Sequence, residues 1–269
     1  MIDSAAIARE IVTARANREP IAVLPSARGL DLPTAYAVEA ELARLRVAAG
    51  HRIVGVKAGY ANKAVWRALK LETLAWASMY DDTVTFATAG TATLAVGRMI
   101  APKIEPEIVV RLASAVPAGL TDAVAVLGHV EWLALGFEII DCPYADWKFQ
   151  PPDFVAAYGL HAALVVGDPY RPASETLGTL AEQLAAFKVT LAKDDAVAAE
   201  GAGKNALRSP ALCVAELATA RERAGLAPFA PGDLISTGTL TESQPMAAGQ
   251  RWTARLDGLP LRALTLSPV

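Results

Sequence analysis

The spacing of hydrophobic residues changes along the chain, and the change separates expected helices from expected strands. In several segments hydrophobic residues recur every three or four positions, which is the spacing of an amphipathic helix. We expect helices at residues 4–16, with Ser4 as the N-cap, and from near Asp31 to Ala49, where Gly50 ends the helix. Three more helices are expected, at residues 61–72, 120–135 and 210–224.

Elsewhere hydrophobic and polar residues alternate, which is typical of strands. Strands are expected at residues 52–60, 84–86, 91–94, 103–112, 136–141, 184–193 and 196–199, and as a final hairpin at 252–266. No internal repeat, low-complexity tract or obvious linker divides the chain. The sequence therefore predicts a helical N-terminal extension at residues 1–50 and one β-rich domain at residues 51–269.

Two of the expected strands carry acidic residues among hydrophobic ones. Glu105 and Glu107 are two positions apart, so a strand directs both side chains to the same face. Glu138 lies between Phe137 and Ile139 in the second strand. A Glu-x-Glu pair alone is typical of the solvent face of an antiparallel sheet. Ionised carboxylates rarely enter a core unpaired, however, and we interpret Glu105, Glu107 and Glu138 as ligands of Mg²⁺ or Mn²⁺.

Lys57 is a second charged residue in a hydrophobic strand, within the segment Val54-Gly55-Val56-Lys57-Ala58. A lysine near the end of a strand commonly extends its ammonium group to solvent. From the residues alone, we expect the same of Lys57.

The amino-acid composition and charge exclude some classes of binding partner. The chain has 269 residues, with 25 basic and 28 acidic residues and a net charge of −3, and the charges are well mixed. It shows no basic stripe for nucleic acid and no polybasic or long apolar segment for a membrane. Its two cysteines, Cys142 and Cys213, form neither a disulfide framework nor a zinc site. We expect a cytoplasmic protein that acts on a small molecule.

Three segments resemble one known family. The run 102–108, followed by Glu138 thirty-one residues after Glu107, is similar to the 2-keto-4-pentenoate hydratase / 4-oxalocrotonate decarboxylase family of the fumarylacetoacetate hydrolase superfamily. The segments 55–60 and 231–241 resemble two further motifs of that family. The resemblance implies an α+β fold with a mixed, rolled β-sheet core, a homo-oligomer, and a divalent cation held by the three glutamates.

The resemblance also implies roles for individual residues. Lys57 is expected to face the active site and relay protons, and Thr239 to bind a substrate carboxylate. Lys148 and Asp82 are two further candidates for substrate binding, although each is equally consistent with a surface turn or ion pair. Asp141 is expected to support the metal ligands.

Residues 153–161 depart from the family pattern. Ala157 and Tyr158 replace an Asp-Asn pair, and His161 is introduced within an apolar run. Such a histidine is commonly a hydrogen-bonded core residue, and a role as a base is the alternative. The departure leaves the identity of the substrate open.

The activity implied by the resemblance is metal-dependent hydration. The expected substrate is a 2-keto or 2-hydroxydienoic acid. A 2-keto acid would bind the cation through one carboxylate oxygen and the keto oxygen, and the cation would neutralise charge on the keto oxygen. The expected reaction adds water to 2-hydroxypenta-2,4-dienoate or a relative to give a 4-hydroxy-2-keto acid, in the breakdown of aromatic compounds. Alternatives are decarboxylation of a 2-keto-3-enedioate, C–C hydrolysis of an acylpyruvate, and a binding protein without catalysis.

Overall fold

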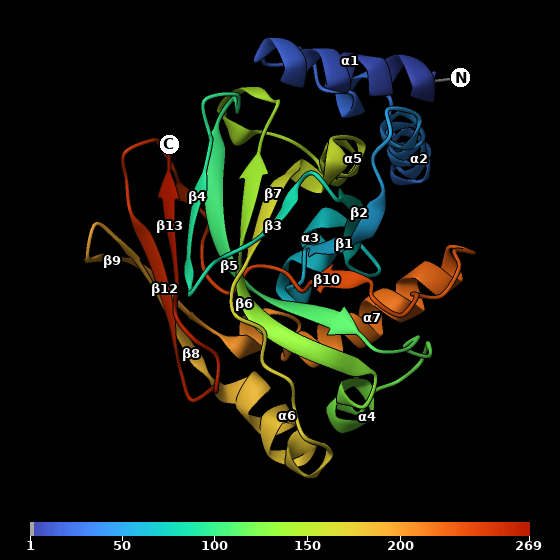
Figure 1. Cartoon of the computed structure of the whole chain (residues 1–269). Helices are drawn as coiled ribbons and strands as arrows, with labels where there is room; N and C mark the ends of the chain where they lie inside the picture. Colours follow the sequence, from blue (N-terminus) through green and yellow to red (C-terminus); the bar gives the residue numbers. More distant parts are fainter. Residues whose placement is uncertain (1–2) are drawn as a thin grey trace.

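A computed structural model describes residues 3–269, and Figure 1 shows two β-sheets with helices at both ends of the larger one. The two N-terminal helices lie together at the top of the view, and α4, α6 and α7 lie toward the bottom. The smaller sheet, which contains the C-terminal strand, stands beside the larger sheet.

The α-helices of the described residues are α1 (Ser4–Asn17), α2 (Leu32–Ala48), α3 (Trp66–Leu69), α4 (Ala123–Leu127), α5 (Pro151–Ala156), α6 (Leu177–Ala186) and α7 (Pro210–Arg223). The strands are β1 (Ile53–Gly59), β2 (Ala75–Tyr80), β3 (Val84–Phe86), β4 (Thr91–Leu94), β5 (Pro102–Leu112), β6 (Val130–Asp141), β7 (His161–Val166), β8 (Lys188–Lys193), β9 (Ala196–Ala202), β10 (Leu234–Ser236), β11 (Gln244–Pro245), β12 (Trp252–Asp257) and β13 (Leu264–Pro268). Short 3₁₀ turns include η2 (Lys63–Val65) and η4 (Tyr158–Leu160).

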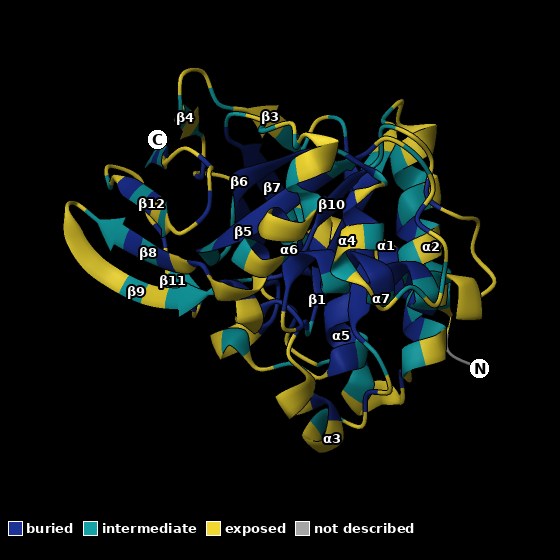
Figure 2. Cartoon of the chain, turned by 90° about the horizontal axis from the view of Figure 1, so that it is seen from below, coloured by how far each residue is buried: buried dark blue, intermediate teal, exposed yellow. Residues whose placement is uncertain are grey.

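The larger sheet is mixed, with strand order β2-β1-β10-β5-β6-β7-β3, and β11 also pairs with β5. The pairs β1–β10 and β3–β7 are parallel, and the other pairs are antiparallel. The smaller sheet has the order β4-β13-β12-β8-β9. At the centre of the larger sheet, β5 and β6 form the longest antiparallel pair. Figure 2 shows both strands largely in dark blue, because most of their residues are buried.

The N-terminal helices are bound to the rest of the chain by a hydrophobic core. Ile7 and Ile11 of α1 and Val38 and Leu42 of α2 are buried in one cluster with Val155 of α5. The predicted start and end of the second helix are confirmed, because the Asp31 side chain accepts a hydrogen bond from Thr34 N and the helix ends at Ala48. The two helices precede β1, in agreement with the expected helical extension, although its division from the rest at residue 50 stays a prediction.

Several local predictions were wrong. The first helix is capped by Asp3 rather than by Ser4, since the Asp3 side chain accepts from Ala6 N. The segment 61–72 contains only the turn η2 and the short helix α3. The expected strand 184–193 begins at Lys188, because α6 continues to Ala186.

The largest error concerns residues 120–135, for which one helix was predicted. The helix α4 ends at Leu127, and β6 begins at Val130. Both faces of β6 are buried, so its residues do not alternate between hydrophobic and polar. A continuous hydrophobic run of this kind does not distinguish a buried strand from a buried helix. None of the described helices has the length and hydrophobicity required to cross a bilayer.

Candidate metal centre

Three carboxylates converge where β5 and β6 pair. Glu105 lies directly opposite Glu138 across the two strands, and Glu107 follows on the same face of β5. One oxygen from each of Glu105, Glu107 and Glu138 lies within 4.8 Å of the others. Glu107 and Glu138 are fully buried, and Glu105 is partly buried. The structure therefore brings together the three residues that were predicted from positions far apart in the sequence.

Only one of the two carboxylate oxygens of Glu107 has hydrogen-bond partners among the described residues. Its Oε2 accepts hydrogen bonds from Ser236 Oγ at 2.6 Å and from Gly238 N at 2.9 Å, while Oε1 is buried and has no hydrogen-bond partner among the described residues. Gly238 has φ +92°, and a Cβ atom there would lie 2.6 Å from the Cβ of Ala61. Glycine is required at this position, because it permits both the backbone conformation and the close approach.

Lys57, at the centre of β1, is the cation of the site. Its Nζ lies 3.1 Å from Glu138 Oε2 and donates a hydrogen bond to Gly159 O at 3.0 Å. The ammonium group also lies 4.8 Å from the centre of the Phe154 ring. Because only 2% of Lys57 is exposed, the alternative of an ammonium group extended to solvent was wrong.

The carbonyl of Gly159, which accepts the hydrogen bond from Lys57, belongs to a strained turn. Tyr158, Gly159 and Leu160 have φ values of 60°, 57° and 61°, and two of the three are not glycine. Such a left-handed conformation costs on the order of 1–3 kcal/mol for each strained non-glycine residue. The turn directs Gly159 O toward Lys57 and places His161 at the start of β7.

His161 contacts the metal-site carboxylates from the other side. Its Nδ1 lies 3.0 Å from Glu138 Oε1, and its Nε2 lies 3.0 Å from Thr83 Oγ1. A carboxylate only accepts, so Nδ1 carries the proton that is donated to Glu138. Nε2 of the neutral ring is an acceptor that competes with Tyr80 O for the single proton of the Thr83 hydroxyl. Burial lowers the pKa of His161 to about 3, which keeps the ring neutral at physiological pH. His161 thus fixes the orientation of Glu138.

Burial and mutual repulsion make the three acids hard to ionise. Burial and the neighbouring Glu107 charge raise the pKa of Glu105 to about 8, and burial and the Glu138 charge raise the pKa of Glu107 to about 8. Burial also raises the pKa of Glu138, although Lys57 opposes the change. Burial lowers the pKa of Lys57, but the three carboxylates more than offset that effect and leave it above its usual value.

The donor set fits a hard divalent cation. Three carboxylates face a single lysine, and Glu107 Oε1 is a buried acceptor without a donor. Oxygen-rich sites with excess negative charge suit Mg²⁺ or Mn²⁺, which also favour ionisation of the carboxylates.

A cavity of about 260 Å³ opens beside Lys57 and Glu105. Its walls include the aromatic rings of Trp147, Phe149 and Phe154. Thr239, predicted to bind a substrate carboxylate, also lines the cavity, and its hydroxyl donates to Thr241 O at 2.8 Å. Its position agrees with the predicted role, whereas the hydroxyl would have to rotate to donate to a substrate.

Three other candidates do not reach this cavity. Lys148 is 80% exposed and pairs with Asp146 at 3.3 Å, so its surface alternative describes the structure. The Asp82 carboxylate pairs with Arg46 and lies at a different cavity, described below. Asp141 accepts hydrogen bonds from the backbone of Ile100 and Ala101 and contacts none of the three glutamates. None of these three lies at the metal centre, and the substrate-binding roles expected for Lys148 and Asp82 stay predictions.

The chain contains a second acidic group at its surface. His51, Asp81 and Asp82 also offer ligand atoms within 4.8 Å of one another. Their carboxylates already have cationic partners, since Asp81 lies 3.1 Å from Arg52 Nε and Asp82 pairs with Arg46. Hydrogen bonds from Arg52 lower the pKa of Asp81. This group differs from the buried glutamates in both exposure and charge balance.

Sequence reasoning missed two contributions to the site. The hydrogen bonds of Ser236 and Gly238 to Glu107 were not foreseen, although both residues lie in the segment 231–241 that resembles a motif of the family. The contact between His161 and Glu138 joins residues 23 positions apart in two strands. The signal for it was a histidine in an otherwise apolar strand, which indicated burial but not its partner.

The comparisons with known proteins agree with this geometry. Residues 52–264 match the family described as fumarylacetoacetate (FAA) hydrolase C-terminal. The chain is 30% identical over 231 residues to 2-hydroxyhexa-2,4-dienoate hydratase of Comamonas testosteroni, across 86% of this chain and 84% of that one. It is 32% identical over 225 residues to 2-hydroxypent-2,4-dienoate hydratase of Pseudomonas putida, across 81% and 95% of the two chains.

A solved structure extends the likeness to the whole fold. The 4-oxalocrotonate decarboxylase from Pseudomonas putida G7, complexed with magnesium and adipate, superposes with a TM-score of 0.87 at 26% identity. The match covers 99% of this chain and 97% of that one. The predicted α+β fold with a mixed, rolled sheet is confirmed, and the chain belongs to the fumarylacetoacetate hydrolase C-terminal family.

Proposed function

We propose that the protein is a divalent-metal-dependent hydratase in the breakdown of aromatic compounds. It would add water to 2-hydroxypenta-2,4-dienoate or a similar acid and release a 4-hydroxy-2-keto acid. The observation that carries the proposal is the group of three buried carboxylates beside Lys57, at the wall of a cavity of about 260 Å³. Relatives at 30% and 32% identity are named as hydratases of 2-hydroxydienoates.

Glu105, Glu107 and Glu138 would hold Mg²⁺ or Mn²⁺. The unpartnered Oε1 of Glu107 and the excess of negative charge support this assignment. When bound, the cation supplies electrostatic stabilisation of the negative charge that develops on the keto oxygen of the substrate. Ser236 and Gly238 would keep Glu107 in place, and His161 would do the same for Glu138.

Lys57 would carry protons at Nζ. In the first stage the substrate loses the proton of its 2-hydroxyl group and gains one at C5, which gives a 2-keto-3-enoate. In the second stage water adds its oxygen to C4 and a proton is delivered to C3. The Lys57 ammonium group is buried, fixed by Gly159 O and adjacent to the cavity, and these contacts support a role in proton transfer.

The remaining walls would orient the substrate. Phe154, Trp147 and Phe149 provide flat apolar surfaces for a conjugated chain and limit the water around it. Thr239 would donate its hydroxyl to the substrate carboxylate after rotation away from Thr241 O. The Asn205 side chain, which also lines the cavity, donates to Leu240 O.

The main alternative is decarboxylation of a 2-keto-3-enedioate, because a 4-oxalocrotonate decarboxylase shares the fold over 99% of this chain. Such a substrate carries a second carboxylate at its far end. Among the residues that line the cavity Lys57 is the only cation, and it is already paired with Glu138. Leaving a second carboxylate without a cationic partner is unfavourable, so the cavity favours a monocarboxylate.

The proposal is tested by following dienol absorbance with 2-hydroxypenta-2,4-dienoate, 4-oxalocrotonate and an acylpyruvate. Each would be assayed with Mg²⁺, with Mn²⁺ and with EDTA. We expect metal-dependent turnover of the dienoate to a 4-hydroxy-2-keto acid, and its loss in Glu107→Gln.

Glu131→Gln is the matched control, because Glu131 lies on β6 but pairs with Arg111 and Arg171 at the surface. Turnover that is unchanged by EDTA would exclude this mechanism, and carbon dioxide release from 4-oxalocrotonate alone would favour the decarboxylase.

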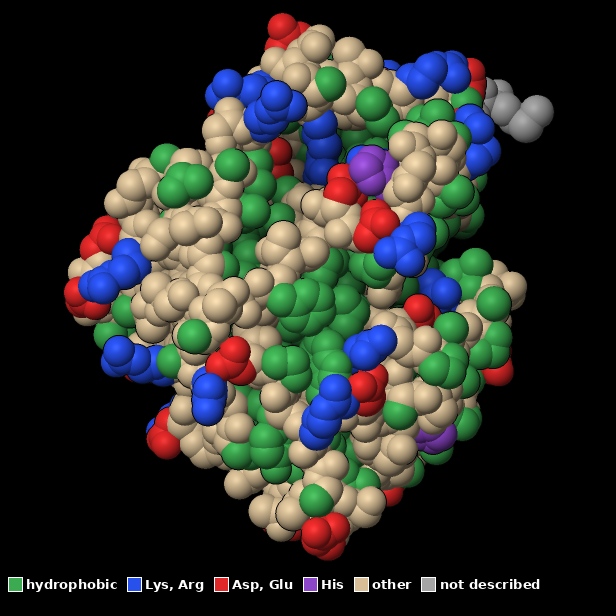
Figure 3. Space-filling model, in the orientation of Figure 1, with side chains coloured by type: hydrophobic (Ala, Val, Ile, Leu, Met, Phe, Trp, Pro, Cys, Tyr) green, Lys and Arg blue, Asp and Glu red, His purple; other side chains and the backbone are tan. Residues whose placement is uncertain are grey.

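We also propose that the protein works as a homo-oligomer in the cytoplasm. Figure 3 shows hydrophobic side chains gathered across the middle of one face of the molecule. On the larger sheet Phe86 is 55% exposed and packs edge-on against Trp132, and Ile53 is 47% exposed. Exposed hydrophobic patches of this kind are typical of interfaces between proteins. Sedimentation velocity measures the mass, and a monomer at micromolar concentration would contradict the proposal.

A further inference from the structure

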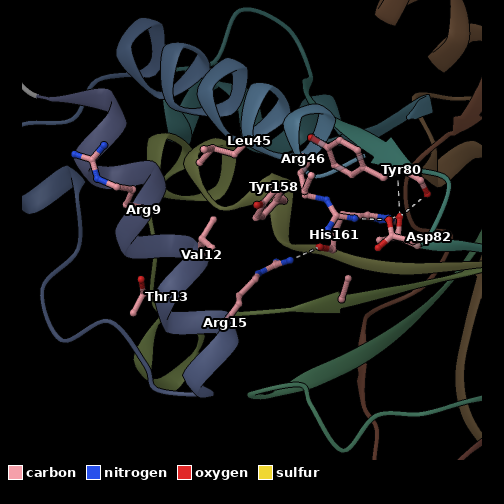
Figure 4. A pocket seen from close by; sticks show the side chains of 13 residues that line it. Arg9, Val12, Thr13, Arg15, Leu45, Arg46, Tyr80, Asp82, Tyr158 and His161 are labelled. Atoms are coloured by element: carbon pink, nitrogen blue, oxygen red, sulfur yellow. Dashed lines mark hydrogen bonds and ion pairs between the residues drawn. The ribbon is translucent and has the colours of Figure 1, made fainter. Parts of the chain in front are cut away.

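A second and larger cavity lies beneath α1 and has no part in the proposed reaction. Its volume is about 560 Å³, within the range of small-molecule sites. It lies between α1, the C-terminal half of α2, the end of β2 and the start of β7 (Figure 4). Figure 3 shows a hollow in the surface beneath α1. The two cavities share no lining residue, so they are separate spaces.

The charge of the second cavity is positive. Its ionised lining residues are Arg9, Arg15 and Arg46 against one carboxylate, that of Asp82. Asp82 pairs with Arg46, so no carboxylate that lines the cavity neutralises the charges of Arg9 and Arg15. Arg9 is 65% exposed and lies 4.0 Å from Asp3, which leaves its charge largely to solvent. Arg15 is the remaining cation and projects from α1 into the centre of the site.

Arg15 is fixed in place without a carboxylate partner. It donates hydrogen bonds from Nη1 to His161 O at 2.7 Å and from Nη2 to Asp141 O at 3.2 Å and Ala157 O at 3.3 Å. Its guanidinium carbon lies 4.8 Å from the centre of the Tyr158 ring. The buried Nε has no hydrogen-bond partner among the described residues. A guanidinium group that three carbonyl hydrogen bonds preorganise, and that no carboxylate neutralises by an ion pair, is suited to binding an anion.

Most of the remaining wall is apolar or aromatic, and Thr13 and Thr83 are polar exceptions. Val12 and Leu45 face the cavity from the two N-terminal helices, and Tyr80, Tyr158 and Ala162 complete the opposite side. The rings of Tyr80 and Tyr158 meet edge to face, with 6.3 Å between their centroids. These surfaces match an apolar body rather than a sugar or a phosphate group, and aromatic pairs favour a flat ring.

We infer that this cavity is a second ligand site, which binds a small carboxylate with an aromatic or aliphatic body. The carboxylate lies near Arg15, and the body packs between Val12, Leu45 and the two tyrosines. The ligand also lies beside His161, whose ring occupies the wall between this cavity and Glu138. The site is therefore distinct from the metal centre but adjoins one of its proposed ligands.

The test uses 4-fluorobenzoate as the probe, followed by fluorine NMR with the full chain. Saturating Mg²⁺ and oxalate occupy the metal centre, so that the probe reports only other sites. We expect saturable binding, and at least about 10-fold weaker binding of the neutral 4-fluorobenzamide, which corresponds to about 1.4 kcal/mol. Equal binding of the two probes, or no saturable binding of either, would overturn the inference.

Two substitutions locate the probe. Val12→Trp fills the cavity from a helix position that is 39% exposed, and it should weaken binding at least about 10-fold. Val47→Trp is the matched control, because Val47 lies on α2, is 53% exposed and does not line the cavity. Binding that is unchanged in Val12→Trp, or equally weakened in both variants, would show that the probe lies elsewhere. Sedimentation velocity compares the same two variants: self-association that is lost in Val12→Trp but kept in Val47→Trp would identify a second copy of the chain as the occupant, which would also overturn the inference.

Discussion

Residues 3–269 contain two groups of three potential metal ligands, and the groups differ in almost every property except geometry. Glu105, Glu107 and Glu138 lie in paired strands and are mostly buried, whereas the group of His51, Asp81 and Asp82 lies at the surface. Two arginines neutralise the surface group. The buried group has one lysine for three carboxylates.

The difference shows that proximity of acids does not define a cation site. In the surface group the arginine hydrogen bonds already satisfy the charge, and the pKa of Asp81 is lowered. In the buried group the pKa values of Glu105 and Glu107 rise to about 8, which means that the protein alone does not stabilise their ionised forms. Burial together with an unmet charge is the physical signature of a site built for a cation.

The sharpest test of this contrast exchanges one carboxylate for an amide in each group. Glu138→Gln removes a proposed ligand that also contacts Lys57 and His161, and we expect kcat/KM to fall by about 10³-fold, or about 4 kcal/mol. Asp81→Asn should leave kcat/KM within about two-fold, since exposed ion pairs contribute little. Steady-state kinetics with 2-hydroxypenta-2,4-dienoate and Mg²⁺ measures both. Equal losses in the two variants would remove the distinction between the groups.

The next test compares the cations beside the two groups. Lys57→Met should lower kcat by about 10²-fold, because it removes a proton carrier from beside the cavity. Arg52→Met changes an 80% exposed side chain beside Asp81 and should leave kcat unchanged. Circular dichroism checks that both variants fold. Full kcat in Lys57→Met would exclude Lys57 from proton transfer.

Substitution of the histidine beside the buried group should have a smaller effect than the loss of a ligand or of Lys57. His161→Ala removes the donor that orients Glu138, and loss of such a supporting residue weakens metal binding by about 10-fold or more. His51→Ala, beside Asp81 and Asp82, should not change the affinity. Isothermal titration with Mn²⁺ gives both dissociation constants. An unchanged constant in His161→Ala would show that Glu138 keeps its position without the histidine.

The pH dependence of stability should have opposite signs with and without a cation. Glu105 and Glu107 have raised pKa values in the folded protein, about 8 against 4.5 when unperturbed, so their contribution to stability is present below pH 4.5 and is lost as the pH rises toward 8. We expect the Tm of the EDTA-treated protein to fall by at least about 5 °C between pH 5 and pH 8. Added Mg²⁺ should reverse the slope, since protons and cations compete for the carboxylates.

Asp81 of the surface group serves as the control for the pH dependence of the Tm. The lowered pKa of Asp81 contributes stability above its usual titration range, and this is lost only as the pH falls below it. Asp81→Asn should therefore leave the change between pH 5 and pH 8 intact. Thermal unfolding followed by fluorescence measures the slope. A flat profile in EDTA would contradict the raised pKa values.

The sequence was most informative where local pattern and topology agree. Alternation identified β5, and the flanking residues of Glu138 identified part of β6, so the approach of three distant acids was predicted correctly. The start of β6 was mistaken for a helix because residues from Val130 onward are buried on both faces. Resemblance to a family, rather than periodicity, supplied the rolled sheet.

Other parts of the site depend on contacts that no local pattern encodes. Asp82 follows a strand and is acidic, but Arg46 of a distant helix determines where its carboxylate points. The role of His161 depends on the register of β7 against β6, in which His161 lies opposite Ile140. Arg15 shows the same limit, since its partners are carbonyls more than a hundred positions away.

The hydrogen bonds from Ser236 and Gly238 to Glu107 determine when the chain can bind a cation tightly during its synthesis. During translation β5 and β6 leave the ribosome long before residue 236 is made, and until then one proposed ligand lacks the two donors that fix it. A nascent chain that ends before β10 would therefore bind Mg²⁺ or Mn²⁺ weakly, even with all three glutamates present. Tight binding of the cation would then be a late event in maturation, and it would signal that β10 has joined the larger sheet.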